Sequence, residues 1–322
     1  MPSALRLIFN AATLVPGVTW LPPIRRKLAK DAIGTGGSGS ARYCYSVWLR
    51  HLTTAAGCGL NTNPRKVAEL GPGDSLGVGL AALLTGAERY YAFDVVEHAS
   101  AEGNLRVLDG LVELLQERAP IPDHHEFPRV VPRLPSYEFP HRILGDERLR
   151  AALDPARIER IRASLKDCTS PDSLITYRAP WYGPELIEPG SIDMLFSQAV
   201  LEHVDALRET YAAMRAWLAP TGFLSHCVDF KSHEFAAEWN GHWTYSDLGW
   251  KLVRGKAIWA INREPWSKHV RLLEETGFRS VHEDVIRRAS SIPEHRFARR
   301  FRAGPATDLT TSDVFYQAVR SV

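Results

Sequence analysis

The chain has 322 residues, of which 45% are hydrophobic, enough to bury a full core. We therefore expect one large domain with insertions and no extensive disorder. The 39 Lys and Arg residues nearly balance the 37 Asp and Glu residues, so the net charge is only +2. This balance argues against a nucleic-acid partner, which would require a strongly basic surface. The four cysteines form no CxxC pair and no metal-finger spacing, a pattern typical of structural cysteines in a reduced, cytoplasmic setting.

Residues 1–63 are expected to form an N-terminal helical segment. Its apolar stretch at 4–24 is interrupted by three prolines, which argues against a secretion signal and against a membrane span. Because a basic run follows at 25–27, one hypothesis is peripheral contact with a membrane surface. The favoured alternative is a helix packed on the main domain. Residues 34–40, GTGGSGS, have the composition of a flexible joint.

The main domain is expected to span residues 64–322 and to begin with a parallel βαβ unit. This unit consists of a buried strand, a Gly-Pro-Gly turn, a helix and a second strand, predicted over residues 66–70, 71–73, 74–85 and 90–95. We expect Asp74 or Ser75 to cap the helix, since both are favourable N-cap residues.

Strand and helix patterns continue to alternate along the rest of the chain. Five further strands are predicted at residues 174–177, 192–196, 223–228, 278–285 and 313–319. Two insertions are expected, one at about 99–172 that contains six prolines between 120 and 140 and one at 230–266 that is rich in tryptophan. A helical stretch is predicted at 146–167. The last strand follows without a crossover helix, which indicates an α/β fold with a mostly parallel sheet and one antiparallel strand.

The first strand and turn suggest where a ligand binds. Glu69 lies near the end of the strand, and Gly71 and Gly73 allow backbone to approach a ligand without an intervening Cβ. Asp94 follows the second strand, where a carboxylate can accept two hydrogen bonds from a ribose diol. The alternative is a turn that merely joins two elements and an Asp that caps a helix. A nicotinamide dehydrogenase is disfavoured because Leu76 stands where its third glycine belongs.

At these positions the chain resembles the class I S-adenosylmethionine-dependent methyltransferases. The resemblance is carried by ELGPG at 69–73, FDVV at 93–96, IDMLFSQAVLEHV at 192–204 and LAPTGFL at 218–224. It implies a Rossmann-like, seven-stranded sheet with the last strand antiparallel, and S-adenosyl-L-methionine as the cofactor. Ser75 replaces the usual third glycine of the loop, and the gap between the second and third strands is longer than usual.

The resemblance also implies roles for individual residues. Glu69 would lie near the methionine amino group, and the backbone of Gly71, Pro72 and Gly73 would run along the methionine moiety. Asp94 would bind the ribose, and Val95 would flank the adenine. The remaining cofactor-side residues would be Ser197 and Gln198 at the end of the fourth strand and Ala179 after the third.

An acceptor hydroxyl must lose a proton, and His203 in LEHV is the first candidate for its general base. Asp229 and His233, which follow the fifth strand, are the next candidates. The alternative role for His203 is to order a turn. His226, Asp229 and His233 would be a possible metal set, but strand alternation places His226 and Asp229 on opposite faces, so no metal is expected.

The loop and the two insertions look most like bacterial methyltransferases associated with surface-polysaccharide synthesis. This favours O-methylation of a sugar or glycan hydroxyl. Two alternatives stay open, methylation of an aromatic or polyketide-like small molecule and a non-catalytic cofactor-binding module on the same fold. A nucleobase methyltransferase is disfavoured, because Ser197-Gln198-Ala199-Val200 stands where an Asn/Asp-Pro-Pro-aromatic tetrapeptide is expected. The oligomeric state is not predicted.

Overall fold

The computed structural model describes residues 4–15, 37–181, 183–257 and 259–321. The basic run at 25–27, the part of the apolar stretch after residue 15 and the start of the predicted joint at 34–36 lie outside the described residues.

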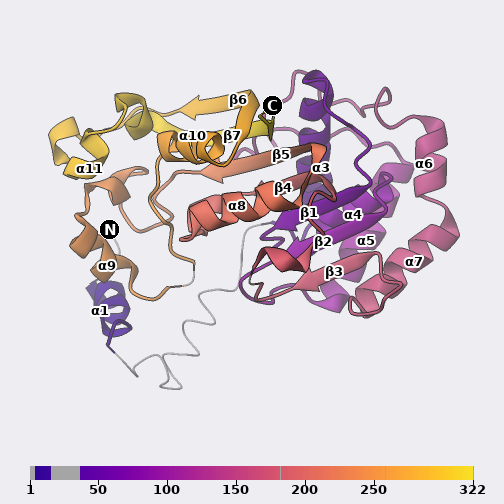
Figure 1. Ribbon diagram of the computed structural model, residues 1–322, viewed down its shortest axis with the longest axis horizontal. Helices are drawn as coiled ribbons and strands as arrows, with labels where there is room; N and C mark the ends of the chain where they lie inside the picture. Colours follow the sequence, from indigo (N-terminus) through magenta and orange to yellow (C-terminus); the bar gives the residue numbers. More distant parts are fainter. Residues whose placement is uncertain (1–3, 16–36, 182, 258, 322) are drawn as a thin grey trace.

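The centre of the molecule is one seven-stranded sheet with the order β3-β2-β1-β4-β5-β7-β6 (Figure 1). Its strands are β1 (Lys66–Leu70), β2 (Arg89–Phe93), β3 (Ile175–Arg178), β4 (Ile192–Gln198), β5 (Leu218–Asp229), β6 (Phe278–Arg287) and β7 (Thr311–Arg320). All pairs are parallel except that β7 runs antiparallel to both β5 and β6. The predicted Rossmann-like α/β sheet with an antiparallel last strand is confirmed.

Helices cover both faces of the sheet. The helices include α3 (Ala41–Gly57), α4 (Gly77–Leu84), α5 (Ala101–Gln116), α6 (Asp146–Ala152), α7 (Pro155–Lys166), α8 (Leu207–Trp217) and α10 (Trp266–Glu275). Successive strand residues alternate between two cores, since Met194 packs with α3, α4 and α5 whereas Leu195 packs with α8 and α10. The remaining helical elements are α1 (Ala4–Ala12), α9 (Asp247–Arg254), α11 (Arg299–Arg302), η2 (Pro184–Leu186), η3 (Leu201–His203), η4 (Gly241–Thr244), η5 (Glu294–Arg296) and η6 (Ala306–Thr310).

The start of α4 differs from the sequence prediction. The helix begins at Gly77, so neither Asp74 nor Ser75 is its N-cap residue, and the turn after β1 is longer than expected. Ser75 nevertheless accepts a hydrogen bond from the N–H of Gly77 (3.0 Å), and Asn104 of α5 accepts one from Leu76 (2.8 Å). Side chains outside the helix thus satisfy two of the N–H groups at its start, which have no partner within the helix.

The helical stretch predicted at 146–167 is two helices. Pro155 occupies the first turn of α7, and Asp154 caps it by accepting hydrogen bonds from the N–H groups of Ala156 and Arg157. A proline is compatible with a first turn but not with a helix interior, so α6 ends before it.

The proline-rich segment after α5 wraps around the fully buried Arg50 of α3. The Arg50 guanidinium donates to the carbonyls of Pro122, Val130 and Pro132 at 2.8–2.9 Å. One cation thereby satisfies carbonyl groups that lie in neither a helix nor a strand. Nothing in the sequence had marked Arg50 as the residue that holds this insertion.

At the other end of the molecule α1 packs against α9 (Figure 1). Asn10 donates to the carbonyl of Val253 (2.7 Å), and Thr13 accepts from the N–H of Lys256 (2.9 Å). The described part of the N-terminal segment therefore packs on the domain, as the favoured alternative proposed. No helix among the described residues is long and apolar enough to cross a membrane.

Candidate functional site

The carboxyl ends of the parallel strands meet at one edge of the sheet. Leu70 at the end of β1 pairs with Phe93 of β2 and with Ser197 of β4, and Phe93 pairs with Arg178 of β3. The residues that follow these strands therefore lie side by side. Such an edge is where open α/β sheets bind their ligands.

The loop after β1 requires glycine. Gly71 and Gly73 have φ angles of +64° and +73°, in the left-handed region that favours glycine. The N–H of Gly71 donates to the carbonyl of Phe93 (2.8 Å) and extends the pairing of β1 with β2. A Cβ on Gly71 would also lie only 2.6 Å from the side chain of Val200, which covers the loop from the end of β4.

Asp94 lies at the end of β2 and faces this loop. Its carboxylate accepts hydrogen bonds from the N–H groups of Gly73 (3.3 Å) and Val95 (2.7 Å). Burial raises the pKa of Asp94, although these backbone N–H groups oppose the shift. A carboxylate has about four acceptor positions, so both oxygens keep capacity for a ligand. Next to it the Val95 side chain is 57% exposed, an unusual position for a large apolar residue beside a buried carboxylate.

Glu69 is buried under the same loop and accepts a hydrogen bond from the hydroxyl of Tyr90. Burial raises the pKa of Glu69 to about 8, while the Tyr90 hydrogen bond opposes the shift. Gly79 of α4 makes this arrangement possible, because a Cβ there would lie 2.0 Å from the Tyr90 ring. Without a cation beside it, Glu69 is predominantly protonated at neutral pH.

The predicted cofactor-side residues after β3 and β4 have different surroundings. Ser197 is fully buried, and its hydroxyl pairs with Nδ1 of His226 at 2.7 Å. Gln198 is half-buried, and its side chain lies against His51, where it opposes the burial that lowers the pKa of His51. Ala199 has a φ of +54°, a strained conformation for a residue with a Cβ. Ala179, directly after β3, is half-buried at the same edge.

The three predicted catalytic residues lie together. The rings of His203 and His233 meet edge to face with centroids 5.0 Å apart, and an Asp229 carboxylate oxygen lies 3.6 Å from Nε2 of His233. Glu202 and Lys231 complete what we call the histidine cluster. Nζ of Lys231 lies 2.9 Å from Asp229 and also pairs with Asp313 of β7.

Burial perturbs the charges of the histidine cluster. Burial lowers the pKa of His203 to about 4, and His233 adds to this effect. Burial also raises the pKa of Glu202 well above its usual range, an effect that the charge of Asp229 strengthens. Burial opposes ionisation of Asp229 as well, but the neighbouring His233 and the charge of Lys231 outweigh it and lower the pKa of Asp229. The pKa values of these two neighbouring carboxyls are therefore shifted in opposite directions, that of Asp229 downward and that of Glu202 upward.

His226 does not belong to the histidine cluster. Its ring lies 5.5 Å from that of Tyr316, on the buried face of β5, whereas Asp229 faces Lys231 and His233. The expected separation of His226 from Asp229 is confirmed. Glu202 was missed by the sequence analysis, although it directly precedes His203 in LEHV and a search for acids beside candidate histidines would have found it.

The tryptophan-rich segment 230–266 packs over η3 and the histidine cluster. Asn262 donates to the carbonyls of Leu201 (2.7 Å) and Val204 (2.8 Å), and its N–H donates to the carbonyl of Glu202 (2.6 Å). Trp243 and Trp250 are buried inside the segment. These two aromatic rings therefore contribute to its packing.

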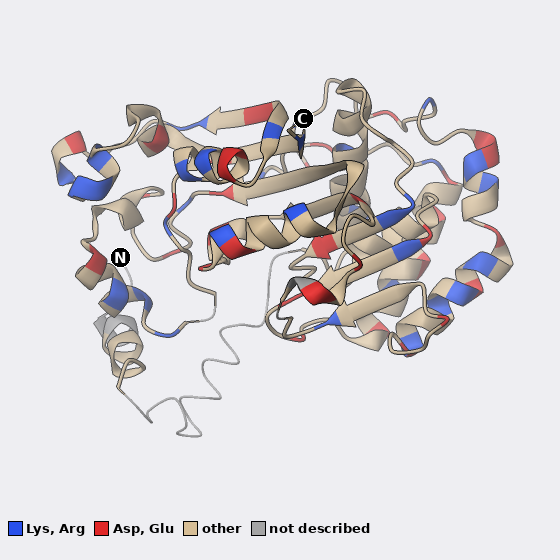
Figure 2. Ribbon diagram, in the orientation of Figure 1, with Lys and Arg blue, Asp and Glu red and all other residues tan. Residues whose placement is uncertain are grey.

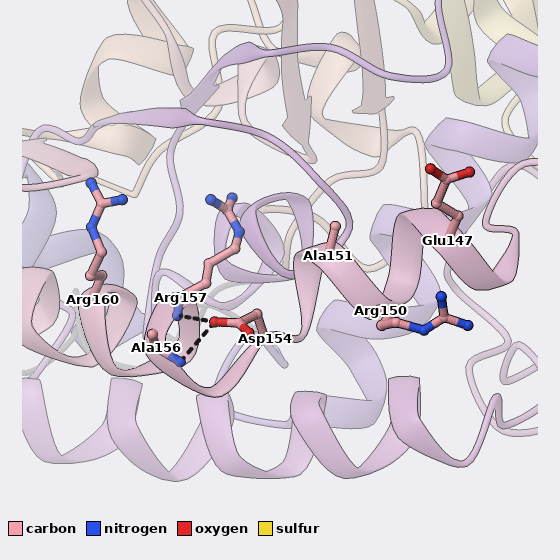
Figure 3. A pocket seen from close by; sticks show the side chains of 7 residues that line it. All are labelled: Glu147, Arg150, Ala151, Asp154, Ala156, Arg157 and Arg160. Atoms are coloured by element: carbon pink, nitrogen blue, oxygen red, sulfur yellow. Dashed lines mark hydrogen bonds between the residues drawn. The ribbon is translucent and has the colours of Figure 1, made fainter.

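Charged side chains are mixed over the described residues (Figure 2). A surface hollow of about 640 Å³ lies between α6 and α7 and is lined by Arg150, Arg157 and Arg160 together with Glu147 and Asp154 (Figure 3). The Arg157 guanidinium is engaged with the carbonyls of Leu83 and Ala87. The hollow contains no residue from the carboxyl edge of the sheet.

No protein-family model and no curated protein matches the sequence. Among solved structures, an S-adenosylmethionine-dependent methyltransferase from Mesorhizobium loti is 14% identical, with a TM-score of 0.38 over 80% of this chain and 91% of that chain. Phosphoethanolamine N-methyltransferase 2 from Haemonchus contortus, in complex with S-adenosyl-L-methionine, is 14% identical, with a TM-score of 0.41 over 85% of this chain and 53% of that one. The citrinin polyketide synthase CMeT domain is 11% identical, with a TM-score of 0.36 over 80% and 47%. Similarity at this level concerns architecture, so the chemistry of this chain has to come from its own residues.

Proposed function

We propose that this chain is an S-adenosyl-L-methionine-dependent methyltransferase. One observation carries the proposal: the Asp94 carboxylate at the end of β2 faces a loop with two left-handed glycines across the carboxyl edge of the sheet. A carboxylate at the end of β2 can bind the ribose diol of the cofactor, and an apolar side chain next to it can pack against the adenine. The exposed Val95 side chain supplies the apolar neighbour.

A further observation fits the cofactor. Glu69 is a buried carboxyl whose raised pKa would fall beside an ammonium group, as a methionine amino group would provide. Gln198 lies at the end of β4 and would contribute to the cofactor side of the site. In this proposal Gly71, Pro72 and Gly73 lie along the methionine moiety, with Ser197 and Ala179 contributing to the walls of the site.

The bound cofactor would supply an electrophilic methyl group on its sulfonium. The protein's task is then to hold an acceptor oxygen in line with that methyl group, which is worth up to about 7–11 kcal/mol of the barrier. We assign His203, Asp229 and His233 to the acceptor side, with His203 accepting the proton that the hydroxyl loses as its oxygen bonds to the methyl carbon.

We further propose a sugar or glycan hydroxyl as the acceptor, in a cytoplasmic setting. The support is chemical, because the acceptor side carries histidines, carboxylates and a lysine, which suit a polyhydroxylated molecule. An aromatic or polyketide-like acceptor would instead require a closed apolar pocket. A binding module without activity would keep the cofactor but transfer no methyl group.

Contact with a membrane surface is a secondary part of the proposal. Four large apolar side chains are exposed on α1, α9 and the turn that follows α1, namely Ile8, Val15, Leu248 and Leu252. Lys251 and Lys256 are exposed nearby, which suits an anionic lipid surface. A membrane-attached glycan acceptor would be consistent with this placement.

Calorimetry with S-adenosyl-L-methionine, its demethylated product and NADH tests the cofactor. We expect both adenosyl ligands to bind and NADH not to bind, and the reverse order would refute the proposal. Labelled methyl transfer into sugar nucleotides, glycans and small phenols, followed by mass spectrometry of the product, then tests the acceptor. Label in phenols alone would favour the aromatic alternative, and cofactor binding without transfer to any acceptor would favour the binding module.

A further inference from the structure

Glu202 is a buried carboxyl, only 3% exposed. Among the residues that the structure describes, neither of its carboxylate oxygens has a hydrogen-bond partner of normal geometry. The backbone N–H groups of Glu202 and Asp229 lie near enough to lower its pKa, but no hydrogen bond of normal geometry reaches either oxygen. Burying an unpaired carboxyl is costly, so a group in this state calls for a partner that the protein itself does not supply.

Two histidines next to Glu202 are also unsatisfied. Nδ1 of His203 and Nε2 of His233 are buried and make no hydrogen bond of normal geometry with a described residue, although backbone of Trp259 and Ala260 lies near the His203 ring and Asp229 lies 3.6 Å from Nε2 of His233. One ligand atom from each of Glu202, His203 and His233 lies within 4.8 Å of the other two. Bonds of about 2.1 Å to a tetrahedral cation would set such atoms about 3.4 Å apart, so a small contraction closes the site.

The three side chains are held in place by the surrounding chain. Asn262 bonds the backbone of η3 at Leu201, Glu202 and Val204, which fixes the element that carries two of the ligands. His233 and Glu234 have φ angles of +44° and +67°, which is strained for residues with a Cβ. Such strain is typical of functional positions. A carboxylate oxygen of Asp229 lies 3.6 Å from Nε2 of His233, so its negative charge would add to the attraction for a cation.

Asp123, His124 and His125 form a second group with suitable spacing. There the Asp123 carboxylate already accepts hydrogen bonds from the N–H groups of His125 (2.8 Å) and Glu126 (3.3 Å). His125 is also exposed. This group serves below as a control.

We propose that Glu202, His203 and His233 bind a divalent transition-metal cation of the zinc or manganese type. Two imidazoles and one carboxylate match the ligand preference of such ions and leave coordination positions open. The cation would provide one partner for the Glu202 carboxylate and for both histidine nitrogens.

The metal site would also have a role in methyl transfer, and this role depends on the proposed function. An acceptor hydroxyl in an open coordination position would lose its proton to water more readily, because a cation stabilises the alkoxide. The oxygen would then form its bond to the methyl carbon as the sulfur–methyl bond breaks. In that case His203 acts as a ligand and not as a base.

Metal binding is tested on the full chain without reference to activity. After removal of metals by chelation, we expect Zn²⁺ to bind at one ion per chain by calorimetry, and Co²⁺ to give the visible absorption of a nitrogen–oxygen site. Glu202→Gln and His233→Ala should each weaken binding by at least about 100-fold. His124→Ala is the matched control and should bind like the parent. Thermal melts of the metal-free variants show whether each one folds.

Two results would overturn the inference: no stoichiometric binding by the parent chain, or binding that survives Glu202→Gln and His233→Ala but is lost in His124→Ala. Methyl-transfer assays separate this inference from the proposed function. Transfer that is unaffected by chelation, together with the absence of metal binding, refutes only the metal site. Stoichiometric metal binding without cofactor binding refutes only the methyltransferase proposal.

Discussion

Binding of the cofactor should release a proton from Glu69. Its pKa of about 8 means that about 90% of the carboxyl is protonated at pH 7 in the free protein. An ammonium group beside a carboxyl lowers its pKa by about 1–3 units. With a shift of about 2 units, about 0.8 proton per cofactor should be released at pH 7, and only about 0.2 at pH 5.5. Affinity should accordingly rise about 25-fold between pH 6 and pH 8.

Calorimetry in buffers of different ionisation enthalpy measures this proton release directly. S-adenosyl-L-methionine and its demethylated product should release equal amounts, because both carry the amino group and only one carries the sulfonium. Glu69→Gln keeps the shape and a partner for Tyr90, so this variant should bind without proton release. Release that persists in Glu69→Gln, or its absence from the parent chain at pH 7, would refute the placement of Glu69 beside the amino group.

The remaining predictions concern the ribose, the acceptor side, the tryptophan-rich segment and the membrane. Asp94→Ala should weaken cofactor binding by about 1.5–3 kcal/mol, the value of charge-assisted hydrogen bonds, and unchanged affinity in calorimetry would contradict the ribose assignment. His203→Ala should lower kcat by about 100-fold or more with cofactor affinity intact; normal turnover in His203→Ala, with loss in Asp229→Ala or His233→Ala, would move the proton acceptor beyond β5. Trp250→Ala should change the KM for the acceptor and spare cofactor affinity, and a lower melting temperature with unchanged kinetics would show that this ring serves packing alone. Leu248→Asp combined with Leu252→Asp should reduce flotation with anionic vesicles while leaving methyl transfer to a soluble acceptor unchanged, and equal flotation would exclude α9 as the contact.

Much of the fold could be predicted because short stretches of sequence determine where its strands lie. The pattern of residues 66–70 places β1 at the residues where it is found, and Thr311–Arg320 follows without a crossover helix, which makes it antiparallel. The ends of helices and strands also depend on residues that are distant in the sequence. The start of α4 depends on Asn104, which lies 28 residues away in the next helix, and no pattern within the turn itself reveals that contact.

The site was only partly predictable for the same reason. The loop glycines and Asp94 lie in short motifs, so their meeting at the sheet edge follows from parallel strand order. The contact of Glu69 with Tyr90 depends on the absence of a side chain at Gly79, a steric fact of the folded protein. The unsatisfied state of Glu202 likewise depends on how the segment 230–266 covers it. Unpaired buried atoms cannot be recognised before the packing is known.

The segment after β4 links the two halves of the site. Val200 packs against Gly71 of the cofactor loop, and two residues later Glu202 enters the histidine cluster. Between the two halves, Ala199 holds its strained backbone through a hydrogen bond to the carbonyl of Cys227 (2.9 Å), and Asn262 fixes η3 from above. If the proposed function is right, these few consecutive residues would set the position of the acceptor relative to the cofactor. Alignment of this kind must be present before the acceptor arrives, which is why the strain at Ala199 is consistent with a catalytic rather than a purely structural role.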